Sequence, residues 1–204
     1  MDYSAALPVN HHADHPGFSG VTGALFALVF LAVGRANARL AVDAAGVTGD
    51  DRVVDIGCGP GEAVRQAARR GAAATGVDPA QAMLRTARLF SRGDTVEFKQ
   101  GTAEHVPLPD GCASVVWSLA TVHHWKDVGA GLREAYRLLV PTGRLLAVER
   151  QSPPAATGLA SHGWTRGQAE SFAAQCRSAG FEAVEVVGRT AGRRDVWVVR
   201  AKRP

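Results

Sequence analysis

A glycine-rich segment is the part of the sequence best suited to chemistry. It reads VVDIGCGPG and contains Asp55, Gly57, Gly59 and Gly61. Glycine lets a backbone turn sharply and approach a ligand that a Cβ atom would push away. A dinucleotide motif would put its third glycine at Glu62, a poor residue beside a pyrophosphate. The acidic Asp55 therefore suits a cationic or amine-bearing ligand, with a tight strand-to-helix turn as the structural alternative.

A second acidic residue, Asp78, follows the next apolar segment. A carboxylate there can accept hydrogen bonds from both hydroxyls of a ribose. An aspartate before a helix is also favoured as an N-cap, which is the structural alternative. Together with the glycine-rich segment, Asp78 favours a nucleoside site. A nicotinamide-dependent reductase is a rival interpretation, and Glu62 and Asp55 argue against it.

Four segments, in order, resemble the class I S-adenosylmethionine-dependent methyltransferases, of the small-molecule type related to quinone methyltransferases. They are VVDIGCGPG, TGVDPAQAML, GTAEHVPLPDGCASVVWS and HHWKDVGAGLREAYRLLVPTGRLLAVE. The resemblance implies an enzyme that binds S-adenosylmethionine, releases S-adenosylhomocysteine, needs no metal and methylates a small acceptor, for which an apolar compound is one candidate. A catalytically silent S-adenosylmethionine-binding partner protein is the alternative from another class.

The resemblance also implies roles for individual residues. Gly57 and Gly59 would approach the methionine moiety, while Asp55 would order that loop and the ammonium group of the ligand. Asp78 would hold the ribose. Further cofactor contacts would come from Gly61 and Pro79, and from Ser118 and Leu119 beside the sulfonium.

The adenine end of the expected site departs from the family pattern at one position. Met83 would pack near the adenine, and Ala103 would offer its backbone N–H to a ring nitrogen. The family often has aspartate where this chain has Thr102. Threonine is a weaker acceptor for the adenine amino group, so Glu104 is a candidate substitute.

Histidines gather in two places along the sequence. His123 and His124 follow the predicted fourth strand, where an acceptor could enter. Histidine can take a proton from a hydroxyl or amine, so both are candidate catalytic residues, with a structural role as the alternative. His11, His12 and His15 lie near the N-terminus without a supporting set of ligands, and we expect no metal there.

Alternating strands and helices must position these residues. Strands are predicted over 52–56, 73–77, 95–100, 112–118, 144–148, 182–187 and 195–200, with a turn at 141–143. Helices are predicted over 21–45, 62–70, 80–90, 128–139 and 166–179. The pattern indicates an α/β fold with a doubly wound, mostly parallel seven-stranded sheet. The last two strands leave no room for a crossover and must form an antiparallel hairpin.

Length and composition narrow the function further. A chain of 204 residues fits one domain, with residues 1–45 packed on a methyltransferase domain over 46–204. The net charge is +4, but no dense Lys/Arg tract interleaved with aromatics suggests a nucleic-acid partner. The cysteines Cys58, Cys112 and Cys176 show neither metal-ligand nor disulfide spacing, which favours a reducing cytoplasm.

An apolar run near the N-terminus needs a separate explanation. It reads GVTGALFALVFLAVG over residues 20–34, too short to span a bilayer and without the flanks of a signal peptide. A helix apolar nearly all round must be covered by something. We expect this N-terminal helical cap to fold over the cofactor cleft and acceptor site, with a homodimer interface as a second expectation.

Overall fold

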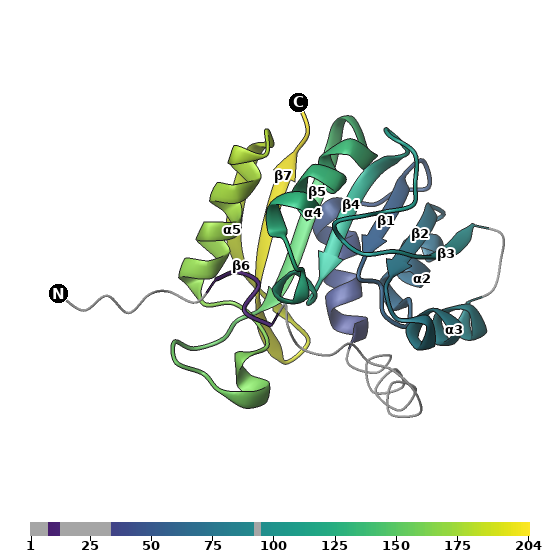
Figure 1. Ribbon diagram of the computed structural model, residues 1–204. Coiled ribbons are helices and arrows are strands. Elements are labelled where there is room, and N and C mark those ends of the chain that lie inside the picture. Colours follow the sequence, from purple (N-terminus) through teal and green to yellow (C-terminus); the bar gives the residue numbers. More distant parts are fainter. Residues whose placement is uncertain (1–7, 13–33, 92–94) are drawn as a thin grey trace.

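The computed structural model describes residues 8–12, 34–91 and 95–204 (Figure 1). Residues 34–45 are helical, so this part of the predicted N-terminal helix is present. The described residues do not include the first part of that helix, with the apolar run up to residue 33, nor His15. The labels below follow Figure 1.

Seven strands form a single sheet, as the sequence predicts. They are β1 (Arg52–Ile56), β2 (Ala73–Asp78), β3 (Val96–Gln100), β4 (Ala113–Leu119), β5 (Leu139–Arg150), β6 (Glu182–Ala191) and β7 (Arg194–Lys202). Their order is β3-β2-β1-β4-β5-β7-β6. The first five strands pair in parallel, and β7 is antiparallel to both β5 and β6. The mostly parallel sheet with an antiparallel C-terminal hairpin is confirmed.

Helices cover both faces of this sheet. They are α2 (Glu62–Arg69), α3 (Gln81–Phe90), α4 (Val128–Leu138) and α5 (Arg166–Ser178), with short 3₁₀ turns η1 (Val122–His124) and η2 (Gly158–Ser161). In Figure 1, α4 and α5 lie in front of the sheet and helical residues 34–45 lie behind it. The apolar side chains accordingly form two clusters, one with α4 and α5 and one with residues 34–45, α2 and α3.

Successive residues of the central strands supply these two clusters in turn. In β4, Val116 belongs to the cluster under α4 and α5, whereas Val115 and Trp117 belong to the cluster under α2. All three side chains are fully buried. A strand that is buried on both faces has a continuous run of apolar residues in its sequence, and this run is why these strands could be predicted.

The predicted turn at residues 141–143 is a bulge inside a longer strand. Thr142 has a φ of 64°, and pairing with β4 shifts between Ala113 and Val115. The backbone stays paired because Thr142 N donates to Arg203 O at 2.9 Å and Arg203 N donates to Gly143 O at 2.9 Å. Contacts with the last residues of the chain therefore extend β5 through a sequence that signals a turn.

The strand order reverses beside β1. The chain runs outward from β1 to β2 and β3, then returns to lay β4 on the other side of β1. Ligands of open α/β sheets bind at such a reversal, beyond the carboxyl ends of the strands. Among the described helices, none is both long and apolar enough to traverse a bilayer.

Candidate active site

The loop after β1 is held in a conformation that requires glycine. Gly57, Gly59 and Gly61 have φ angles of 77°, 51° and 78°, the left-handed region that L side chains disfavour. Gly57 N donates to Val77 O at 2.8 Å, which ties the loop to the end of β2. Gly59 N donates to Oδ2 of Asp78 at 2.8 Å. The loop is therefore ordered by the neighbouring strand.

The three glycines differ in what surrounds them. A Cβ atom on Gly57 would lie 2.5 Å from Oγ1 of Thr121, and one on Gly61 would lie 2.7 Å from the ring of Phe98. A Cβ atom on Gly59 would meet nothing within 4 Å. Gly57 and Gly61 therefore allow close packing of the protein itself, whereas Gly59 leaves open space at the carboxyl end of β1.

Asp78 joins the glycine loop to helix α3. Its Oδ2 accepts from Gly59 N, and its Oδ1 accepts from Ala80 N at 2.9 Å. Burial raises the pKa of this carboxyl, and the two backbone hydrogen bonds oppose that rise. Asp78 therefore fixes the start of helix α3, as the structural alternative predicts. Its contact with a ribose stays a prediction, and each carboxylate oxygen still has a lone pair that could accept a hydrogen bond from a ribose hydroxyl.

Asp55 carries an unsatisfied oxygen beneath the loop. The residue is 2% exposed, and its Oδ1 has no hydrogen-bond partner among the described residues. Burial raises the pKa of the carboxyl to about 7, the indole of Trp117 lowers it, and the charge of Asp78 raises it further. Nε1 of Trp117 is also buried without a partner among the described residues, and a side-chain hydrogen bond from this indole is what lowers the pKa, so the indole and a ligand are both candidate partners for Oδ1.

Glu62 has a structural role at the start of α2. Its carboxylate accepts from Arg65 at 2.9 Å and from Gln66 at 2.9 Å. Arg35, on the helix over residues 34–45, lies 3.8 Å away. This negative charge in the first turn occupies the helix end where a dinucleotide pyrophosphate would bind. The expectation that Glu62 disfavours such a cofactor agrees with this geometry.

His123 is fixed by a buried carboxylate that the sequence analysis missed. Glu149, in β5, is 0% exposed. Its Oε2 accepts from Nδ1 of His123 at 2.8 Å, and its Oε1 accepts from Val122 N at 2.8 Å. With the hydrogen on Nδ1, the lone pair of His123 lies on Nε2. That nitrogen can then take a proton or bind a ligand.

His124 lies beside it and touches the N-terminal segment. Its Nδ1 donates to His12 O at 3.2 Å, and burial, followed by the charge of His123, lowers the pKa of His124 to about 4. His12 N in turn donates to His123 O at 2.9 Å, and the side chain of Asn10 donates to Trp125 O at 3.0 Å. Residues 8–12 therefore form part of this site.

Comparison with known proteins agrees with the fold and the glycine loop. A family model described as a methyltransferase domain matches residues 54–147. An uncharacterized methyltransferase of Bacillus subtilis, YdaC, is 30% identical over 143 residues, which cover 69% of this chain and 77% of that protein. The chain belongs to the class I S-adenosylmethionine-dependent methyltransferases.

Other methyltransferases match a shorter part of the chain. The 27-O-demethylrifamycin SV methyltransferase of Amycolatopsis mediterranei is 36% identical over 114 residues, 53% of this chain and 42% of that protein. The match to YcgJ of Bacillus subtilis likewise covers 42% of that protein, so the chain spans less than half of either relative. A Haloferax volcanii methyltransferase, solved with the Trm112 methyltransferase activator, has a TM-score of 0.76 at 19% identity, covering 89% of this chain and 94% of that one. This last likeness concerns the fold.

The methyltransferase residues expected at the adenine end lie along the loop after β3 and the start of α3. Met83 and Ala103 are buried, whereas Thr102 is exposed and its backbone pairs with His105. Oε1 of Glu104 accepts from Lys126 N at 2.8 Å. This contact ties the Glu104 carboxylate to the segment before α4. The predicted role of Glu104, to accept a hydrogen bond from the adenine amino group, therefore competes with a structural role.

The residues expected beside the sulfonium lie at the end of β4. Ser118 is buried, and its Oγ is 2.6 Å from Oγ1 of Thr121. Thr121 also donates to Ile56 O at 3.2 Å, which links β4 to the glycine loop. Leu119 is half-buried, and Pro79, after β2, is exposed. Thr121 was missed because nothing in its local sequence marks a contact with Gly57.

Proposed function

We propose that this chain transfers the methyl group of S-adenosylmethionine to a small-molecule acceptor. The observation that carries the proposal is the pairing of open space at Gly59 with the unsatisfied Oδ1 of Asp55. A buried carboxylate oxygen without a hydrogen-bond partner suits a cationic ligand group, and an ammonium is one. Family membership supports the same cofactor.

The residues of the glycine loop and of β2 would hold the cofactor. Gly59 allows close approach to the backbone, Asp55 would accept from the ammonium, and Asp78 would accept from the ribose. When bound, S-adenosylmethionine supplies a methyl group already activated by a sulfonium. The protein's task is then to align the acceptor and exclude water, so few catalytic groups are needed.

The histidines after β4 would handle the acceptor's proton. Glu149 holds Nδ1 of His123, which leaves Nε2 as the nitrogen that can take a proton. His124 is neutral at pH 7 because its pKa is lowered to about 4, so its Nε2 is also an acceptor. We infer that one of these nitrogens takes the proton of a hydroxyl or amine as it is methylated.

Titration calorimetry with three cofactors tests the binding step. We expect S-adenosylmethionine and S-adenosylhomocysteine to bind at least tenfold more tightly than NAD. Tighter binding of NAD would end the proposal. Radiolabelled methyl transfer into a metabolite extract tests the chemistry. Binding without any transfer would indicate a catalytically silent partner protein instead.

The apolar run over residues 20–34 would cover the bound acceptor. We propose that residues 1–45 and 46–204 act as one unit in a reducing cytoplasm, with the apolar run over the acceptor or in a homodimer interface. Deleting residues 1–34 should abolish methyl transfer and promote aggregation. A truncated chain that stays monomeric, soluble and fully active would show that the run has neither role.

A further inference from the structure

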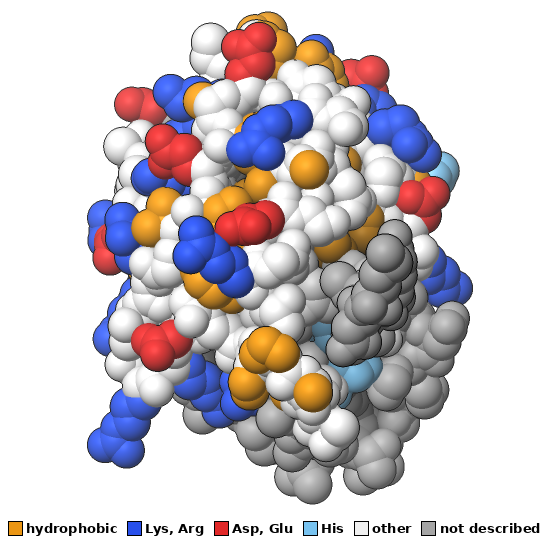
Figure 2. Space-filling model, turned by 90° about the vertical axis from the view of Figure 1, so that its left-hand side faces the viewer, with side chains coloured by type: hydrophobic (Ala, Val, Ile, Leu, Met, Phe, Trp, Pro, Cys, Tyr) orange, Lys and Arg blue, Asp and Glu red, His pale blue; other side chains and the backbone are white. Residues whose placement is uncertain are grey.

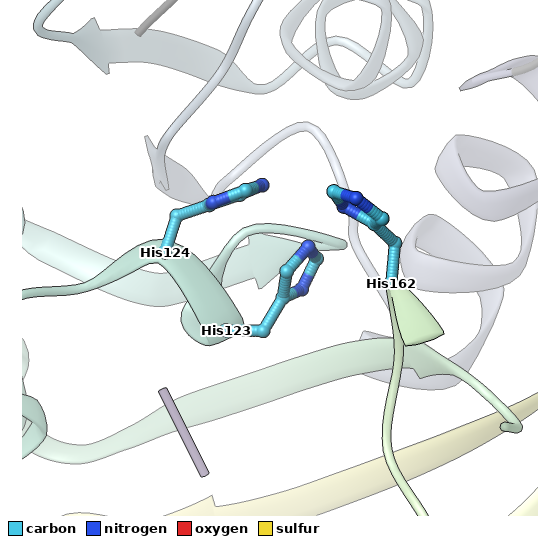
Figure 3. A group of neighbouring side chains, drawn as sticks. All are labelled: His123, His124 and His162. Carbon is cyan, nitrogen blue, oxygen red and sulfur yellow. The ribbon is translucent and has the colours of Figure 1, made fainter. Parts of the chain in front are cut away.

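Three histidines from two distant segments converge on the acceptor side of the site. His123 and His124 come from η1, and His162 follows η2 (Figure 3). One ring nitrogen of each lies within 4.8 Å of the others. The ring centroids are 4.2 Å apart for His123 and His124, 5.6 Å for His123 and His162, and 5.7 Å for His124 and His162. Figure 3 shows the rings pointing toward a common space.

Each of the three rings is oriented by a neighbour. His123 donates from Nδ1 to Glu149, and His124 donates from Nδ1 to the carbonyl of His12. The ring of His12 stacks on His162 with centroids 4.1 Å apart and planes 11° from parallel. Histidines that bind metals almost always donate their second ring N–H to a carboxylate or backbone carbonyl. Two of the three have this arrangement, which leaves Nε2 of each as the candidate ligand atom.

We propose that His123, His124 and His162 bind a divalent transition metal, for which Zn²⁺ is the best candidate. Imidazole nitrogens suit zinc, copper, nickel and iron, whereas magnesium and calcium require oxygen ligands. Zinc bonds to histidine at about 2.0–2.1 Å, so tetrahedral ligand nitrogens are about 3.3 Å apart. His124 and His162 are only half-buried, and small rotations of their side chains would bring the nitrogens to this spacing.

The ligand count indicates what the metal would do. Structural zinc sites use four protein ligands, while catalytic sites use three and leave one position open. Three histidines on the acceptor side would leave a position for a hydroxyl or thiol of the acceptor, whose pKa a divalent cation lowers, so that its proton would pass to water. The resulting oxygen or sulfur anion would form a bond to the methyl carbon as the bond from that carbon to the sulfonium breaks, which releases S-adenosylhomocysteine. This role rests on the proposed function and would replace direct proton transfer to His123, but metal binding itself is independent of it.

Zinc titration of the tag-free chain, stripped with a chelator and free of S-adenosylmethionine, tests the site. We expect one equivalent of Zn²⁺ to bind the wild-type chain and to raise its melting temperature. His162→Ala should weaken binding at least tenfold and lose the rise in melting temperature. His162→Cys, which restores a zinc ligand, should regain both.

His105→Ala is the matched control, because His105 is an exposed histidine of the loop after β3 and does not belong to the cluster. Its zinc binding should equal that of the wild type. Equal binding by wild type and His162→Ala would overturn the proposal and place the metal elsewhere, as would no binding by the wild type. Either failure would leave methyl transfer standing, because the titration omits the cofactor.

Discussion

The two parts of the proposed site, one for the cofactor and one for the acceptor, are built in different ways. The cofactor side consists of short motifs at the ends of β1 and β2, tied by bonds such as Gly59 N to Asp78 at 2.8 Å. The acceptor side brings together residues 8–12, η1 and the end of β5 through His12, His123 and Glu149. The motifs of the cofactor side follow the successive strands β1 to β4, with Thr121 linking β4 to the glycine loop, whereas the acceptor side also requires β5 and residues 8–12.

Charged side chains of both signs share one face of the molecule. On the face drawn in Figure 2, Lys and Arg side chains alternate with Asp and Glu, and histidine side chains reach the surface. A mixed surface of this kind does not favour a polyanionic partner.

Gly59→Val should have the largest effect on cofactor binding and leave the acceptor side unchanged. Valine disfavours the φ of 51° at this position, and its side chain would fill the open space. We expect the Kd for S-adenosylmethionine to weaken roughly a hundredfold or more, while the histidines stay in place. Titration calorimetry measures the effect.

Gly111→Val is the control for backbone strain. Gly111 has a φ of 60° and also has nothing within 4 Å of an added Cβ, but it precedes β4 at the other end of the strand. Its substitution should leave cofactor affinity unchanged. Equal losses in both variants would mean that strain, and not a blocked ligand, explains the result.

Asp78→Ala should have the next largest effect. Hydrogen bonds to a charged group contribute about 1.5–3 kcal/mol, so a tenfold to hundredfold loss of affinity is expected. Asp127→Ala is the control, because Asp127 caps α4 through Ala130 N at 2.9 Å without touching the glycine loop. If the two variants bind the cofactor equally well, Asp78 serves only as a helix start.

Glu149→Gln should act on the acceptor side alone. The amide can still accept from Val122 N, but it removes the charge that orients His123. We expect kcat for methyl transfer to fall about tenfold and the Kd for S-adenosylmethionine to stay the same. A parallel loss of cofactor affinity would show that the two sides are not separable.

Asp55 should make cofactor binding depend on pH, with a smaller effect. Its pKa is raised to about 7, so a cationic ligand group must bind the ionised form. We expect affinity at pH 6 to be about tenfold weaker than at pH 8, because the ionised fraction of a group with this pKa changes by that factor, and Asp55→Asn to remove this dependence. A wild-type Kd that is constant over this range would contradict the assignment.

The same carboxyl predicts a direction for stability without cofactor. The folded state keeps a proton between pH 3.8 and about 7 that the unfolded chain has lost. The free energy of unfolding should therefore fall as pH rises through this window, and Asp55→Asn should flatten the curve in chemical denaturation.

Sequence reasoning succeeded where the relevant contacts are local. The glycine turn after β1, the helix start at Asp78 and the doubly buried strands all have signatures within a few residues, while the ligand contacts of these residues stay predictions. It failed for Thr121, Glu149 and His162, whose partners lie far away in the chain. Glu149 carried one signal, an acidic residue at the end of an otherwise apolar strand. The bulge at Thr142 was read as a turn because its pairing with Arg203 cannot be seen locally.

The contacts of residues 8–12 set an order for folding. Val9 O accepts from the indole of Trp164 at 3.0 Å, and Pro8 O accepts from the side chain of Gln168 at 3.0 Å. Residues 8–12 leave the ribosome before Trp164 and Gln168 have been synthesised. This segment can therefore form these contacts only after α5 and the sheet have formed. Its docking is then a late event that a few hydrogen bonds stabilise. Amide hydrogen exchange should find this segment opening more readily than β1 or β4.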